Sequence, residues 1–253
     1  MVLLADFPNL ADPGVITALL TLTVLEIILG VDNIIFISIV SNKLPEHQQP
    51  RARLIGLTLA MLFRIALLFG ITWLIGLTQP LFTVPFFKDD GKDIFISWKD
   101  LILIAGGIFL IFKSTMEIHQ KLQKPGPHAQ KVAARAFLAV ILQIVMVDAV
   151  FSFDSILTAI GLVDNVWTMI VAVVISMIIM MLFSGSISRF INKHPTLQIL
   201  ALAFLIMIGM LLVAEGFHQE INKSYVYTAI AFSLVVELIN MRLRRNRQMV
   251  ELN

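Results

Sequence analysis

Apolar residues run along this chain in seven long stretches, which short polar segments separate. A helix needs about 20 such residues to cross the roughly 30 Å hydrocarbon core of a bilayer. The stretches cover about residues 14–41, 54–78, 100–119, 136–162, 166–188, 197–216 and 225–241. The pattern therefore predicts an all-α, polytopic membrane protein with seven transmembrane helices, built as a single transmembrane domain over residues 1–253.

Composition supports a membrane location and excludes several other classes. Hydrophobic residues make up 58% of the chain and charged residues 14%, against about 25% charged residues in soluble domains. The net charge is only +2, and the basic residues flank apolar spans, so nucleic acid is not an expected partner. The chain has no cysteine, which excludes disulfides and thiolate metal sites. The N-terminus lacks a basic region and a small-residue cleavage site, so we expect no cleavable signal peptide.

Lysine and arginine alternate between the two sides that the spans define. Cytoplasmic connections are normally enriched in these residues, and thirteen of the nineteen fall on one side when the N-terminus is placed outside. The sequence therefore predicts an external N-terminus and a basic cytoplasmic tail at 242–253.

Two apolar stretches carry the same acidic motif. In the first span Glu26 is followed six residues later by Asp32, and in the fourth span Asp148 is followed six residues later by Asp154. The two copies lie 122 residues apart at both positions. Ionisable side chains at bilayer depth cost several kcal/mol, so by default they indicate a functional site.

The spacing of the two copies gives them opposite orientations in the membrane. Three helices separate them, so residues 14–119 and 136–216 are predicted to form two inverted three-helix repeats, with 225–241 as an additional helix. The segments Gly107–Lys113 and Gly209–Glu215 give weaker support to the same division. Inverted repeats with polar groups near the midplane are typical of secondary transporters.

The acids of one motif do not share a face on a regular helix. Glu26, Gly30 and Asn33 lie on one side, whereas Asp32 points about 120° away from Glu26. Either each helix presents two polar faces, or it is unwound between its acids so that both converge. Gly30 favours unwinding in the first span, and the sequence leaves both arrangements open.

The donor atoms at this depth are oxygens of carboxylate, amide and hydroxyl groups. Such hard ligands suit Mg²⁺, Ca²⁺ or Mn²⁺ rather than Zn²⁺ or Cu⁺. Four acids repel one another unless a divalent cation or protons neutralise them, and burial with like charges raises carboxyl pKa values. We therefore expect a transported cation exchanged against protons, and no permanently bound cofactor.

Other charged residues are candidate counter-ions or gating residues. Two of them suggest an alternative in which the acids have a purely structural role. The acids could simply pair with Arg64 of the second span or with Lys113 of the third. Glu117 and Glu215 lie near helix ends, where we expect solvated groups or pairing partners. The methionine run Met177, Met180 and Met181 has the spacing of a helix-packing stripe, and packing is the preferred interpretation.

Several motifs together resemble the TerC family, which is named for tellurium resistance. They are residues 26–33, 106–113 with Glu117 and His119, 151–161, and 225–227 with 236–240. The resemblance implies a bacterial inner-membrane protein, with members assigned to manganese export and others linked to tellurite resistance or metal homeostasis. At the positions that match the family's acidic motifs, the resemblance implies that the ion ligands are Glu26, Asp32, Asn33, Asp148 and Asp154.

The leading hypothesis is thus a proton-coupled exporter of Mn²⁺ or a similar cation, with the lipid bilayer, the cation and protons as partners. A non-transporting component of a tellurite or metal stress-resistance system, or a proton-coupled exporter of another small solute, are the alternatives. An enzyme is not expected, because no motif places a nucleophile beside a base. Association into a homo-oligomer is left open.

Overall fold

The computed structural model describes residues 12–89, 92–122, 133–160, 163, 165–219 and 221–251, although some side chains within these ranges are not described. The elements in chain order are α1 Pro13–Ser41, α2 Gln49–Phe69, α3 Ile71–Gly76, β1 Pro80–Asp89, β2 Lys92–Ser97, α4 Trp98–Leu122, α5 Ala133–Ile160, α6 Val166–Asn192, α7 Pro195–Gly216 and α8 Lys223–Glu251.

Seven of the described helices are long and apolar enough to cross a membrane, namely α1, α2, α4, α5, α6, α7 and α8. The prediction of seven transmembrane helices is therefore confirmed. Large apolar side chains such as Leu182 and Phe232 are 74% and 70% exposed, as expected for surfaces that face lipid.

Local sequence signals explain where several of these helices begin. Asp12 accepts the backbone N–H of Gly14 at the start of α1, and Asn165 accepts those of Trp167 and Thr168 at the start of α6. Such side chains satisfy donors that have no partner within the helix. A proline occupies the first turn of α1, α2 and α7, where its missing N–H costs nothing.

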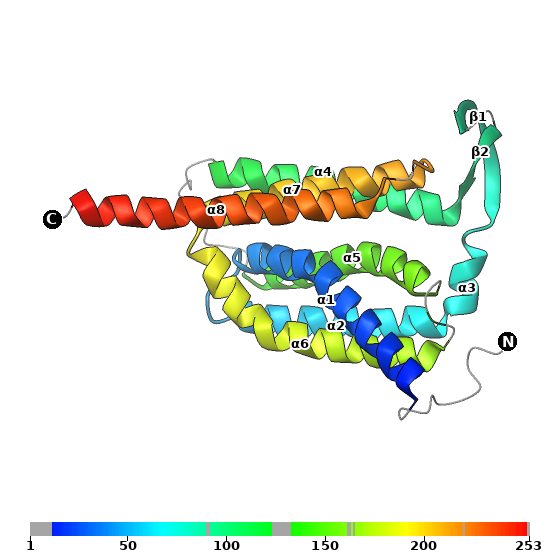
Figure 1. The fold of residues 1–253 in the computed structure, drawn as a ribbon, viewed down its shortest axis with the longest axis horizontal. Helices are drawn as coiled ribbons and strands as arrows, with labels where there is room; N and C mark the ends of the chain where they lie inside the picture. The colour runs from blue at the N-terminus through cyan, green and yellow to red at the C-terminus, as the bar shows by residue number, and fades with distance from the viewer. Residues whose placement is uncertain are drawn as a thin grey trace.

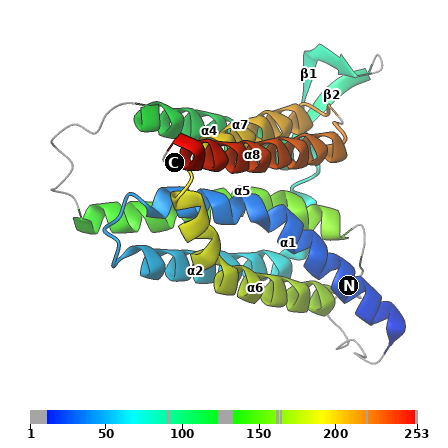
Figure 2. The ribbon, with the colours of Figure 1, turned by 60° about the vertical axis from the view of Figure 1, so that its left-hand side comes forward.

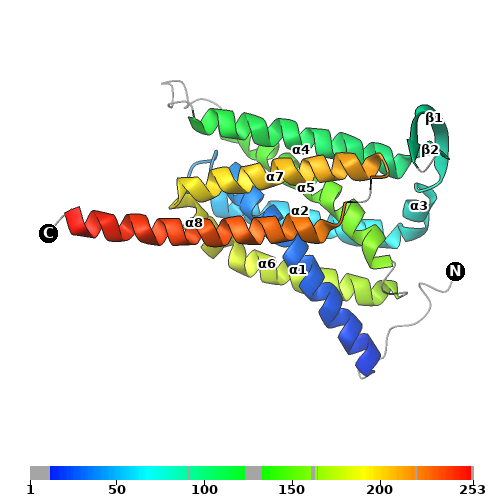
Figure 3. The same cartoon turned by 45° about the horizontal axis from the view of Figure 1, so that its top comes forward.

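The long helices form two groups that run side by side (Figure 1). In the first group α1 packs mainly on α6, and α2 packs on α5 and α6. In the second group α4 packs along α7, and α8 contacts α7 from outside (Figure 2). We call the end that carries the β1–β2 hairpin the hairpin end and the opposite one, toward which α8 projects, the tail end (Figure 3).

A pair of glycines brings α4 and α7 into close contact. A β-carbon on Gly107 would lie 2.5 Å from the carbonyl oxygen of Gly209, and one on Gly209 would lie 2.8 Å from that of Gly107. Small residues at such crossings let helix backbones approach closely in membranes. The contact is reciprocal, as a twofold relation between the two helices would require, while the inverted repeat itself remains a prediction.

The connection between α2 and α4 differs from its prediction. The sequence predicts an all-α protein with only a polar segment between the apolar stretches 54–78 and 100–119, but β1 and β2 pair there as an antiparallel hairpin. The predicted span 54–78 divides into α2 and the short helix α3, because the chain turns at Gly70. At the other end of the chain α8 continues past residue 241 to Glu251, since Arg, Gln and Met residues favour helix even outside the apolar span.

The two helices that carry the acidic motifs are continuous. The backbone is α-helical from Pro13 to Ser41 in α1 and from Ala133 to Ile160 in α5, so neither is unwound between its acids. α1 accommodates its neighbours by bending (Figures 1 and 2). Of the two arrangements that the sequence left open, the continuous helix is the one observed.

Candidate functional site

One arginine joins the acids of the two motifs inside the first helix group. Arg64 of α2 donates from Nε to Oδ2 of Asp148 at 3.0 Å and from Nη2 to Oδ1 at 2.8 Å. Its Nη1 donates to Oε2 of Glu26 on α1. Glu26, Arg64 and Asp148 are 6%, 2% and 3% exposed. Equivalent acids from the two sequence copies therefore meet at one buried guanidinium.

Two further polar side chains complete this cluster. Asn33 Nδ2 donates to Asp148 Oδ1 at 3.3 Å, and Ser152 Oγ lies 3.0 Å from Asp148 Oδ2. The Asn33 Oδ1 atom is buried and has no hydrogen-bond partner among the residues whose side chains are described. A buried carbonyl oxygen without a partner costs about 1–3 kcal/mol, which is accepted more readily at a binding site than in a core.

The charges in the cluster do not cancel. Two carboxylates face one guanidinium, which leaves one formal negative charge in a region that excludes water. Breaking a buried ion pair by removing one partner typically costs about 3–5 kcal/mol, because the remaining charge stays uncompensated. The cluster therefore stabilises the packing of α1, α2 and α5 while retaining attraction for a further cation.

The outcome for the five predicted ligands is mixed. Glu26, Asn33 and Asp148 come together, as the shared motif predicts. The side chains of Asp32 and Asp154 lie outside the described residues, although their backbones belong to α1 and α5. Within the part of the chain that the structure describes, no group of three His, Cys, Asp or Glu side chains could hold a metal ion.

The four residues predicted as counter-ions or gates lie in three different groups of ion pairs. Arg64 pairs with Glu26 and Asp148, as the structural alternative proposed. Lys113 instead lies 3.5 Å from Glu117, its neighbour one turn along α4. Glu117 is 2% exposed and also accepts from Lys43, which follows α1 at the tail end. Glu117 is therefore a pairing partner that joins the two helix groups.

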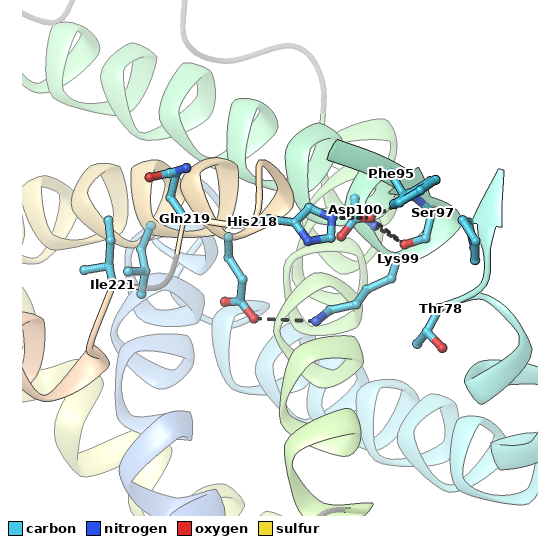
Figure 4. Close-up of a pocket in the computed structure, with 11 residues that line it drawn as sticks. Thr78, Phe95, Ser97, Lys99, Asp100, His218, Gln219 and Ile221 are labelled. Atoms are coloured by element: carbon cyan, nitrogen blue, oxygen red, sulfur yellow. Dashed lines mark hydrogen bonds and ion pairs between the residues drawn. The ribbon is translucent and has the colours of Figure 1, made fainter. Parts of the chain in front are cut away.

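Glu215 lies near the opposite end, on the wall of a second polar site that the sequence did not indicate. Its Oε1 is 3.8 Å from Lys99 Nζ. Both residues line a cavity of about 590 Å³ between the hairpin, α4 and the end of α7. Figure 4 shows His218 and Asp100 meeting at the wall of this cavity, with His218 Nε2 3.2 Å from Asp100 Oδ2.

The buried Asp100 belongs to a helix cap, for which the sequence does carry a signal. The Ser97 N–H donates to Asp100 Oδ2 at 2.8 Å, and the Asp100 N–H donates to Ser97 Oγ at 3.3 Å. This reciprocal pattern is a capping box, readable from Ser-Trp-Lys-Asp at 97–100. His218, in the turn that follows α7, joins this turn to Asp100 and has a positive φ of 58°. The sequence carries no signal for this contact.

Seven apolar helices around a buried acid–arginine cluster define a polytopic integral membrane protein. The model of the family described as "Integral membrane protein TerC family" matches residues 11–251. The chain belongs to this family, so the resemblance expected from its motifs is confirmed.

Curated relatives agree with this assignment. The chain is 48% identical over 240 residues to the UPF0053 inner membrane protein YoaE of Escherichia coli K12, covering 94% of this chain and 45% of the relative. It is 46% identical over 240 residues to the UPF0053 protein YegH of the same organism, covering 94% of this chain and 44% of the relative.

A shorter relative matches over nearly its whole length. This is a UPF0053 protein of Haemophilus influenzae, 46% identical over 240 residues, with 94% of this chain and 98% of the relative covered. The chain spans less than half the length of YoaE and YegH. No solved structure shows significant similarity to it.

Proposed function

We propose that the protein is a secondary transporter that exports a hard divalent cation, with Mn²⁺ as the leading candidate, in exchange for protons. The observation that carries this proposal is the pair of buried acids, Glu26 and Asp148, together with Asn33 Oδ1, which has no hydrogen-bond partner among the described side chains. These oxygens suit Mn²⁺ or Mg²⁺. The TerC family's association with membrane transport and metal resistance supports the proposal, and the outward direction rests on the family resemblance.

Arg64 supplies the counter-charge when no cation is bound. Its guanidinium donates hydrogen bonds to both carboxylates, so their oxygens are held in place in the absence of metal. A divalent cation has to compete with the guanidinium for the same carboxylate oxygens. This competition keeps binding weak enough for release, which a transporter requires, and protons on the acids would assist release in the same way.

Independent observations support the location and the orientation that we propose. The relative YoaE is named an inner membrane protein, which supports a bacterial inner-membrane location for this chain. The tail end carries most of the connections rich in Lys and Arg, which supports a cytoplasmic tail end and an external hairpin end.

A structural role for the acid–arginine cluster is the second candidate, and one observation favours it. The guanidinium of Arg64 already engages both oxygens of Asp148 as well as Glu26, as a cluster that only holds helices together would do. The protein would then act as a non-transporting component of a metal or tellurite stress-resistance system.

Ion flux in proteoliposomes separates the two candidates. Purified protein is reconstituted with an imposed pH gradient, and Mn²⁺ uptake is compared between the wild type and the variants Glu26→Gln, Asp32→Asn, Asp148→Asn and Asp154→Asn. Glu237→Gln is the matched control, since it neutralises an acid in the span of α8, a helix that packs on α7 outside the first group.

We expect gradient-dependent flux in the wild type and in Glu237→Gln, and loss of flux in the site variants, each shown to be folded by size-exclusion chromatography. If folded wild-type protein transports none of Mn²⁺, Mg²⁺ or Ca²⁺, the transporter proposal fails and the structural role of the cluster is favoured.

A further inference from the structure

A methionine sulfur lies against the helix face that carries the candidate ligands. Met180 of α6 is 2% exposed, and its Sδ would be only 2.3 Å from a β-carbon built on Gly30 of α1. The missing side chain at Gly30 therefore creates the notch that the thioether fills. Gly30 lies between the two acids of the first motif, where the sequence suggested an unwound helix, but in the structure it instead admits this sulfur.

The position of Gly30 places the sulfur on the same face of α1 as two of the oxygen donors. Because α1 is continuous, Gly30 lies one turn after Glu26 and one turn before Asn33 on the same face. A rise of 1.5 Å per residue puts it about 6 Å along the axis from Glu26 and about 4.5 Å from Asn33. Glu26 and Asn33 both reach into the cluster around Asp148 and Arg64.

Packing alone would give Met180 the same burial, since methionine commonly fills irregular gaps. The neighbouring Met181 illustrates a sulfur with another role, because its Sδ accepts a hydrogen bond from Thr58 Oγ1 at 3.8 Å. What distinguishes Met180 is that it packs on Gly30, one turn before Asn33, a buried residue whose Oδ1 has no hydrogen-bond partner among the described side chains. That oxygen indicates a ligand at this level of the helix, independently of the sulfur.

We propose that Met180 Sδ is a soft ligand of the transported cation and determines which metal the site prefers. The inference rests on the proposed transport function and deepens it. The donor set is Glu26 and Asp148 carboxylates, Asn33 Oδ1 and Met180 Sδ. Mg²⁺ and Ca²⁺ bind oxygen ligands, whereas thioether ligands select softer metals. The sulfur therefore favours Mn²⁺, and still more a soft probe such as Cd²⁺, over Mg²⁺.

Equilibrium binding of three metals to the full chain in lipid nanodiscs tests this selectivity. Mn²⁺, Cd²⁺ and Mg²⁺ are titrated into the wild type, Met180→Leu and the matched control Met181→Leu. Leucine keeps the apolar volume and removes the sulfur. In Met180→Leu we expect Cd²⁺ affinity to fall about tenfold, Mn²⁺ affinity to fall about threefold and Mg²⁺ affinity to stay within about twofold, while Met181→Leu keeps the wild-type order.

X-ray absorption on the Cd²⁺-loaded wild type gives a readout that does not depend on the folding of any variant. The chain has twelve methionines and no cysteine, so a sulfur neighbour of bound Cd²⁺ has to be a methionine. We expect a sulfur shell in the wild type and its loss in Met180→Leu.

The outcomes separate this inference from the proposed function. Three results would overturn the role of Met180 and leave cation transport standing. They are equal ratios of the metal affinities in the wild type and Met180→Leu, the same loss of Cd²⁺ affinity in Met181→Leu, and an absorption spectrum with oxygen neighbours only. A wild-type protein that binds none of the three metals would overturn both.

Discussion

Arg64 donates hydrogen bonds to both carboxylate oxygens of Asp148, with Nε 3.0 Å from Oδ2 and Nη2 2.8 Å from Oδ1. This side-on geometry is the stronger form of an arginine–carboxylate pair. It fixes α2 against α5, while the remaining Nη1 reaches Glu26 on α1. Three helices of the first group therefore depend on one guanidinium.

We expect Arg64→Gln to lower the free energy of unfolding by about 3–5 kcal/mol, because two buried carboxylates lose their counter-ion. The drop should appear as a lower thermal midpoint of the detergent-purified protein. Asp148→Asn and the double variant complete a mutant cycle, in which direct pairing predicts a coupling of about 0.5–3 kcal/mol.

Arg53→Gln provides the control for this cycle. Arg53 is a second buried arginine of α2, but it donates to the hydroxyl of Ser188 rather than to an acid. Its replacement should cost clearly less than that of Arg64. Equal losses at the two positions, or additive effects of Arg64→Gln and Asp148→Asn, would contradict the pairing as a source of stability.

The glycine crossing of α4 and α7 predicts opposite effects of one substitution at two sites. In Gly107→Ala the new methyl group would lie 2.5 Å from the Gly209 carbonyl oxygen, so the helices have to separate, at a cost of about 1–3 kcal/mol. In Gly185→Ala nothing lies within 4 Å of the new atom, and the better helix former gains about 0.5–1 kcal/mol.

Thermal midpoints of the two glycine variants measure this contrast directly. The Gly107 variant should melt below the wild type and the Gly185 variant at or above it. A Gly107→Ala protein as stable as the wild type would show that α4 and α7 do not cross so closely.

Much of this architecture is readable from the sequence because bilayer thickness fixes helix length. The seven spans follow from apolar stretches alone, and the pairing of Glu26 with Asp148 at one site follows from their equivalent positions in two motif copies. Each of these features depends on local pattern.

Other features could not be predicted, because they depend on which helices become neighbours. Arg64 was one of two cations that could pair with the acids, and only the packing of α2 on α5 selects it. Lys113, the other choice, pairs within its own helix with Glu117. The contact between Met180 and Gly30 likewise joins positions 150 residues apart, and no local sequence signal predicts it.

The last prediction concerns the tail end, where Lys43 reaches from the end of α1 to Glu117 and Gln120 of α4. These contacts join the first helix group to the second. If the groups move apart there to admit a cation, fixing this junction has to stop transport. The cysteine-free sequence allows Lys43→Cys and Gln120→Cys to be joined by a flexible, reducible bifunctional reagent without background reaction.

We expect this cross-link to remove most Mn²⁺ flux in proteoliposomes and reduction to restore it. Asn42→Cys with Asn192→Cys is the matched control, since these side chains bond to each other at the same end but within the first group, with Asn192 Nδ2 2.7 Å from Asn42 Oδ1. Its cross-link should leave flux nearly unchanged. Undiminished flux through the Lys43–Gln120 cross-link would show that the two groups do not separate at the tail end, whereas arrest by both cross-links would show that α1 and α6 also have to move apart.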